Sequence, residues 1–227
     1  FEVGGTGAAG CWLATGGREN NLKLWDVATQ SVAFAAKSPK QNELGIWDKP
    51  WVSALLFLDP AACPSVVLCG TANHQLRLYD ARAKRRPVFE VEWGENRITS
   101  LCLSGDLVSV GSGHAVSGDG GEGDSGEGYS GSVWCGNAIG QIFSLDLKMR
   151  QMSASLKGTL GSVRSLARHP DPAKPFLLAC GLDRFLRVYD LKKRQQVCAV
   201  YLKQYLNTVD VMQDLQLEEE EEEGEEE

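Results

Sequence analysis

Arginine and lysine side chains gather where the sequence predicts turns, and binding is the chemistry that they suit best. A guanidinium group can hold a phosphate or a carboxylate through two parallel hydrogen bonds. These cations therefore predict contact with RNA phosphates or acidic protein surfaces, and an ordinary solvated strand face is the alternative. No aromatic stacking platform interleaves them along the sequence, which disfavours RNA. The cations are Arg18, Lys84, Arg85, Arg86, Arg164, Arg184, Arg187 and Lys192–Arg194.

Residues that often carry catalysis are sparse. The three histidines, His74, His114 and His169, stand far apart, and no nucleophile motif accompanies them. The seven cysteines include no C-x-x-C pair, so they predict reduced, buried thiols of a cytosolic or nuclear protein rather than a disulfide framework or a metal site. We predict neither an enzyme nor a cofactor, and no apolar run of membrane length points to a membrane partner.

A glycine-rich stretch at residues 111–131 holds nine glycines, four acids and no lysine or arginine. A phosphate-binding loop would need a lysine and the start of a helix after its glycines, and this stretch has neither. Its acids, Asp119, Glu122, Asp124 and Glu127, match no calcium loop in their spacing. We predict a flexible, disordered insertion.

The charge of the chain is divided between its body and its end. The net charge is −7, but residues 218–227 contain nine glutamates. Without those nine, 23 Lys and Arg oppose 21 Asp and Glu, so the body carries about +2. We predict a disordered acidic tail at 213–227, with basic proteins as the alternative to a merely solvated run.

Four repeated segments must position the cations. Each has alternating apolar residues, which indicate a strand, and each ends in an aspartate that begins a turn. The fold expected is all-β, a WD-repeat β-propeller of about four blades over residues 1–212. The structural turn residues predicted are Asp26, Asp80, Asp146 and Asp190, together with Asp183, six positions before Tyr189.

Individual strands are clearest in the fourth repeat. We expect strands at 163–168, 176–180, 185–189 and 196–201. In the third repeat both 107–111 and 132–136 look like the second strand, so its register stays open. The apolar run 206–212 resembles the first strand of a further blade.

Several stretches also resemble one particular family, that of WD-repeat protein seventy-four and its fungal counterpart, a nucleolar assembly factor of the large ribosomal subunit. The resemblance covers roughly residues 12–210. It is carried, in order, by GGRENNLKLWD (16–26), FAAK (34–37), GIWDKPW (45–51), RRPVFEVEWGE (85–95), KGTLGSVRSLARHP (157–170), GLDRFLRVYD (181–190) and AVYLKQYLN (199–207).

The resemblance implies a seven-bladed ring, of which this chain would be a fragment holding the four C-terminal blades. It implies a non-catalytic protein of the nucleus and nucleolus. Its partners would be assembly factors and ribosomal proteins of the pre-60S particle, pre-ribosomal RNA, the exosome helicase, and a AAA-type ATPase that releases it. It adds Glu19, Asn20 and Lys203 to the partner-binding candidates Arg18, Arg85, Arg86, Arg164, Arg184 and Arg187.

A substrate receptor of a cullin-type ubiquitin ligase is the alternative function. Such receptors often carry W-D-x-R after a blade strand, and residues 79–82 read Tyr-Asp-Ala-Arg. Tyrosine replaces tryptophan in this single near match. Purification with a ligase adaptor, rather than with ribosomal precursors, would distinguish this function.

Overall fold

The computed structural model describes residues 2–7, 10–38, 49–58, 65–105, 108–109, 129–171 and 173–211. Every regular element within these ranges is a strand, so the expected all-β class is confirmed. Of the predicted insertion 111–131 only residues 129–131 are described, and the predicted tail 213–227 lies outside the described residues. No described helix is long and apolar enough to cross a membrane.

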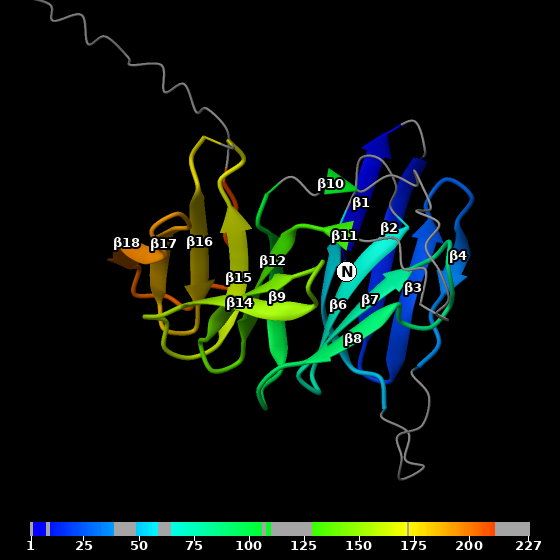
Figure 1. Cartoon of the computed structure of the whole chain (residues 1–227), viewed down its shortest axis with the longest axis horizontal. Coiled ribbons are helices and arrows are strands. Elements are labelled where there is room, and N and C mark those ends of the chain that lie inside the picture. The colour runs from blue at the N-terminus through cyan, green and yellow to red at the C-terminus, as the bar shows by residue number, and fades with distance from the viewer. Residues whose placement is uncertain are drawn as a thin grey trace, which may run out of the picture.

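The strands form four antiparallel sheets of four strands each, which follow one another side by side from blue to orange in Figure 1. The first blade consists of β1 (Glu2–Gly7), β2 (Gly10–Gly17), β3 (Asn20–Asp26) and β4 (Ser31–Ala35). The second consists of β5 (Val52–Phe57), β6 (Val66–Thr71), β7 (Gln75–Asp80) and β8 (Phe89–Glu92). The third consists of β9 (Ile98–Leu103), β12 (Ser132–Asn137), β13 (Ile142–Asp146) and β14 (Gln151–Leu156). The fourth consists of β15 (Val163–Arg168), β16 (Phe176–Gly181), β17 (Phe185–Asp190) and β18 (Gln195–Tyr201).

The third blade resolves the register that the sequence left open. Its second strand is β12, which pairs with β9 on one side and β13 on the other. The described residues of the rival segment form β10 (Val108–Ser109), which pairs with β11 (Tyr129–Ser130) in a separate two-stranded ribbon. The physical reason is burial: Val133 and Cys135 of β12 are fully enclosed, so that segment supplies the core of the blade.

The core lies between blades. Leu22, Leu24 and Phe34 of the first blade pack with Val67 and Tyr79 of the second. A fully buried leucine contributes about 1.5–3 kcal/mol relative to an exposed one, so these contacts hold the blades together as well as each sheet. Equivalent clusters join the second blade to the third and the third to the fourth.

Glycines let neighbouring blades approach closely. A Cβ atom at Gly70 would stand 2.6 Å from Cγ2 of Ile98, the first residue of the next innermost strand. Gly16 and Gly136 face Val52 and Val163 in the same way. The repeated glycine therefore marks the point where one blade meets the next.

The run 206–211 forms no strand, unlike the prediction, and residue 212 is outside the described chain. It nevertheless lies where the innermost strand of a next blade would lie. Ser165 Oγ of β15 donates to the Val209 carbonyl at 3.4 Å, and the Leu206 amide donates to the Gly181 carbonyl at 3.3 Å.

Candidate functional site

One end of the arc carries the turns between the second and third strands of each blade, together with the segments leading into the innermost strands. Successive antiparallel strands alternate in direction, so these turns meet at the same end. We call this region the arginine end, defined by Arg18, Arg97, Arg164 and Arg184 with the aromatic residues Trp51 and Tyr205.

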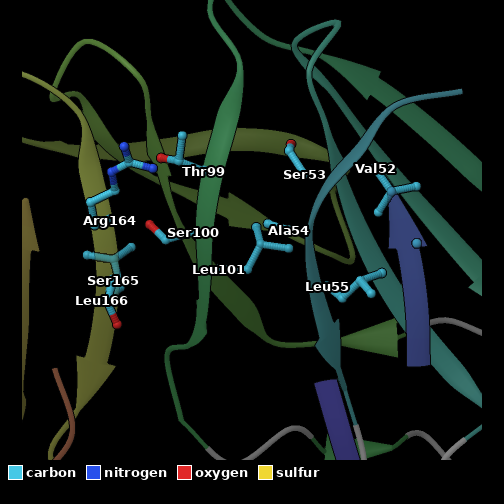
Figure 2. A pocket seen from close by; sticks show the side chains of 11 residues that line it. Val52, Ser53, Ala54, Leu55, Thr99, Ser100, Leu101, Arg164, Ser165 and Leu166 are labelled. Atoms are coloured by element: carbon cyan, nitrogen blue, oxygen red, sulfur yellow. The ribbon is translucent and has the colours of Figure 1, made fainter. Parts of the chain in front are cut away.

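A cavity of about 260 Å³ opens between the innermost strands, lined by β5, β9, β15 and Gly16 of β2. Figure 2 shows Ser53, Thr99 and Arg164 toward one end of these three strands. A second cavity of about 260 Å³ adjoins it and is lined by Trp51, Ser53, Arg97, Thr99 and Arg164. Among the residues that the structure describes, no aspartate or glutamate lines either cavity, so both favour an anionic ligand.

The hydroxyl groups in these walls serve the fold. Ser53 Oγ lies 2.5 Å from the Ile98 carbonyl of the next blade, and Thr99 Oγ1 lies 2.5 Å from the Val163 carbonyl. Each hydroxyl has one proton to donate, and a protein carbonyl receives it. In the first cavity the buried Ser100 Oγ has no hydrogen-bond partner among the described residues. In the second cavity the guanidinium groups of Arg97 and Arg164 have no hydrogen bond or ion pair to another described residue and remain for a ligand.

Two arginines of this end lie against aromatic rings that are distant in sequence. Arg18 Cζ stands 5.1 Å from the centre of the Trp51 ring, and Arg184 Cζ stands 4.7 Å from that of Tyr205. Arg184 Nη2 also donates to Tyr205 Oη at 3.0 Å. Hydrogen bonds from the Arg184 guanidinium to Tyr205 and Tyr201 raise the pKa of Arg184, and the arginine lowers the pKa of Tyr205. Along the sequence no aromatic platform interleaves with these cations, but the fold brings Trp51 and Tyr205 beside two of them.

Arg85 and Arg86 lie elsewhere, on the outer rim between the first and second blades. With Lys37 and Lys84 they line a cavity of about 300 Å³. Arg85 Nε donates to the Ala35 carbonyl at 2.7 Å, and the Lys37 amide donates to the Arg85 carbonyl at 2.7 Å. Arg85 therefore helps to join two blades, whereas Arg86 is an exposed cation.

Arg187 was predicted to bind a partner, and the structure removes it from that set. It is only 5% exposed, and its Nη1 pairs with Asp183 Oδ2 inside the fourth blade. Asp183 also accepts the amides of Leu160 and Phe185, each at 3.3 Å. Because its charge is neutralised by Asp183 and covered by the blade, Arg187 is not presented to a partner.

The remaining candidates lie at the surface. Glu19 pairs with Lys49 at 3.4 Å, and Asn20 Nδ2 donates to the Arg18 carbonyl at 3.3 Å. Lys203 is exposed and has a positive φ of 61° in the turn after β18.

The four strand-ending aspartates make the same local bond. Each Oδ1 accepts the backbone amide two residues later, at 2.8–2.9 Å, which closes an Asx turn. These aspartates are Asp26, Asp80, Asp146 and Asp190.

Sequence reasoning missed two residues at this end. Arg97 directly precedes β9, and its position before an innermost strand is the signal that could have identified it. Asn137 ends β12, and its Oδ1 accepts the amides of Ile139 and Gln141 at 3.2 and 2.8 Å. It thus braces the third-blade turn.

The described cysteines are free thiols, and no cluster of three or more potential metal ligands occurs among the described residues. Burial raises the pKa of the Cys69 and Cys135 thiols, and it raises that of Cys102 to about 11. These thiols stay protonated at neutral pH, and a neutral thiol is a poor nucleophile and metal ligand.

Comparison with known proteins agrees with the architecture. The family model described as WD domain, G-beta repeat matches residues 150–190, which span β14 to β17. The chain is similar to WD repeat-containing protein 74 of Homo sapiens and of Bos taurus, at 36% identity over 200 residues, 86% of this chain and 44% of each relative. It is also 26% identical over 220 residues to the ribosome biogenesis protein NSA1 of Saccharomyces cerevisiae, covering 91% of this chain and 46% of that protein.

The chain spans less than half the length of these relatives. Within that part, the propeller blades, the WD-repeat match and the similarity over most of the chain agree. The chain therefore resembles WD repeat-containing protein 74 over most of its own length and shares its WD-repeat character.

Proposed function

We propose that this chain acts as a non-enzymatic WD-repeat scaffold in ribosome biogenesis, on precursors of the large ribosomal subunit. The observation that carries the proposal is its similarity, over 91% of its length, to a protein named for ribosome biogenesis. The proposed site of action is the nucleolus and nucleus. The proposed partners are pre-60S assembly factors, ribosomal proteins and pre-ribosomal RNA, with the exosome helicase acting nearby.

The geometry suits a scaffold because the blades form a rigid support for short turns. Buried leucines and the hydroxyl bonds of Ser53 and Thr99 tie each blade to the next. The exposed arginines at the blade ends provide many individually weak, charge-based contacts. Such an interface holds a partner in place, and a AAA-type ATPase can remove it by breaking the contacts one after another.

The test is association. A tagged form of the full chain is expressed in cells of the source organism, the extract is sedimented, and co-purifying proteins are identified by mass spectrometry. The proposal expects large-subunit precursors, their ribosomal proteins and their assembly factors. Recovery at the top of the gradient without these proteins, or with a cullin-ligase adaptor, would reject it.

The release step has its own test. A AAA-type ATPase that binds but cannot hydrolyse ATP is expected to trap the chain on late precursors, because the contacts are then never broken. The same cells with active ATPase serve as the control. An unchanged distribution in the gradient would remove the ATPase from the proposal and leave the scaffold role standing.

A further inference from the structure

We propose that the arginine end binds single-stranded RNA, with phosphates on Arg97, Arg164 and Arg184 and bases on the rings of Trp51 and Tyr205. The inference rests on the proposed function and names the partner of this end. It gives a direct chemical role to residues that lie in three different blades or in the segments between them.

The surface is continuous. Trp51, Arg97 and Arg164 line one cavity at the mouth of the space between the innermost strands. The turn that holds Arg184 lies beside the start of β15, because the Leu182 amide donates to the Ser162 carbonyl at 3.1 Å. The path therefore runs from Trp51 past Arg97 and Arg164 to Arg184 and Tyr205.

The charge along this path is positive and available. Neither Arg97 nor Arg164 has a side-chain partner among the described residues. Among the described acids, Glu19 pairs with Lys49, and Asp183 pairs with the buried Arg187. Glu95 and Asp210 are exposed, and neither lines the cavity. A chain of phosphates can follow such a path, with affinity that falls as salt rises.

The aromatic rings decide between RNA and an acidic protein. Trp51 is 37% exposed and Tyr205 is 62% exposed, and each has a guanidinium beside it. Unpaired bases stack on aromatic rings and on guanidinium planes, whereas a carboxylate partner uses only the guanidinium. A nucleotide uses both features, so the paired arrangement favours RNA.

The chain contains its own control surface. Lys37, Lys84, Arg85 and Arg86 form a cationic patch on the outer rim, and no described aromatic residue lines it. This patch provides electrostatic attraction without stacking. Arg86→Gln therefore removes one exposed charge and leaves the proposed path intact.

The experiment measures binding of the purified chain to a fluorescein-labelled uridine dodecamer by anisotropy, at two salt concentrations. A duplex of the same length and a dodecaglutamate peptide are the competitors. Single-stranded RNA is expected to bind best. Arg97→Gln with Arg164→Gln is expected to weaken binding at least about tenfold, Tyr205→Ala by about 5- to 100-fold, and Arg86→Gln by no more than about twofold.

Trp51→Ala serves as a second stacking variant, with Trp51→Phe as the change that keeps a ring and restores binding. A melting curve of every variant checks that it folds. If Trp51→Ala lowers stability, Tyr205→Ala still tests stacking, because Tyr205 is exposed. Preference for the glutamate peptide would overturn the proposal in favour of an acidic protein. The proposal would also be overturned if Arg86→Gln weakened RNA binding as much as the double variant did. Unchanged RNA binding in both Trp51→Ala and Tyr205→Ala would overturn it as well.

The two proposals fail in different ways. A chain that co-sediments with ribosomal precursors but does not bind the dodecamer refutes only the RNA site. A chain that binds the dodecamer but never associates with precursors refutes the proposed function.

Discussion

The second and fourth blades contain nearly the same third strand, QLRLYD at Gln75–Asp80 and FLRVYD at Phe185–Asp190, in different surroundings. All six residues of β7 are buried, whereas only Arg187 and Tyr189 of β17 are. The second blade packs against blades on both sides, and the fourth packs, within the described residues, against the third alone. A shared sequence thus gives a shared strand, but its burial depends on the neighbouring blades.

The arginines at the third position of these strands make the same point. Arg77 Nη2 donates to Gln75 Oε1 at 2.6 Å, and its Nε lies 3.3 Å from Glu90 Oε1 across the sheet. Arg187 instead pairs with Asp183 in the preceding turn. A buried charge is costly unless it is paired. Each guanidinium group is therefore neutralised by an acid of its own blade.

The largest expected difference between the second and fourth blades is in the free energy of unfolding lost when the apolar residue before the tyrosine of the third strand is truncated. Leu78→Ala should lower the free energy of unfolding by about 2–5 kcal/mol, because Leu78 is fully enclosed between two blades. Val188→Ala should cost about 1 kcal/mol or less, since Val188 is only partly buried. Urea unfolding followed by tryptophan fluorescence measures both. Equal costs would mean that the open face of the fourth blade is covered in solution, and a dependence on protein concentration would identify a second copy as the cover.

The ion pairs provide the next test. Asp183→Ala should lower the free energy of unfolding by about 3 kcal/mol, because it leaves the Arg187 guanidinium, whose side chain is 7% exposed, without its partner. Glu90→Ala should cost about 1 kcal/mol, since Glu90 is more exposed and Arg77 keeps Gln75. Adding Arg187→Met to Asp183→Ala should restore part of the loss. No recovery in this double-mutant cycle would show that Asp183 acts through its backbone bonds alone.

The contact between blades can be probed at a single glycine. Gly70→Ala should cost about 1–3 kcal/mol, because its Cβ would overlap Ile98 of the third blade. Gly17→Ala is the matched control: nothing lies within 4 Å of its Cβ position, and its cost should be within a few tenths of a kcal/mol. In the fourth blade the register places Cys180 opposite Leu186, as Gly70 stands opposite Leu76. Similar melting temperatures for the two glycine variants would contradict the close approach.

The smallest effect is expected from the thiols at alkaline pH. Burial raises the pKa of Cys102 to about 11, while an unfolded cysteine titrates near 8.5. The unfolded chain therefore releases this proton first, and stability falls as the pH rises from about 8.5 toward 11. Cys102→Ala should reduce the loss between pH 8 and pH 9.5 by about 1 kcal/mol. Parallel profiles for wild type and Cys102→Ala would disprove the effect.

Local patterns were enough to identify the blades. In the fourth blade the strands predicted at 163–168, 176–180, 185–189 and 196–201 differ from β15 to β18 by at most one residue at any end. Alternation of apolar residues and the Asx turn of Asp190 depend on neighbours within a few positions, so one sequence suffices to read them. The third blade was ambiguous because two segments had equally good strand patterns, and burial against the adjacent blades selected β12.

The composition of the candidate site was decided by the tertiary structure. The sequence placed Arg18, Arg164 and Arg184 near turns because turn signals are local. It could not reveal that Trp51 lies over Arg18 or Tyr205 over Arg184, since these partners come from other segments brought together by the packing of the blades. Nor could it show that Arg187 is covered while the cation Arg164 is open, because burial is set by what the neighbouring strands and turns place around a side chain.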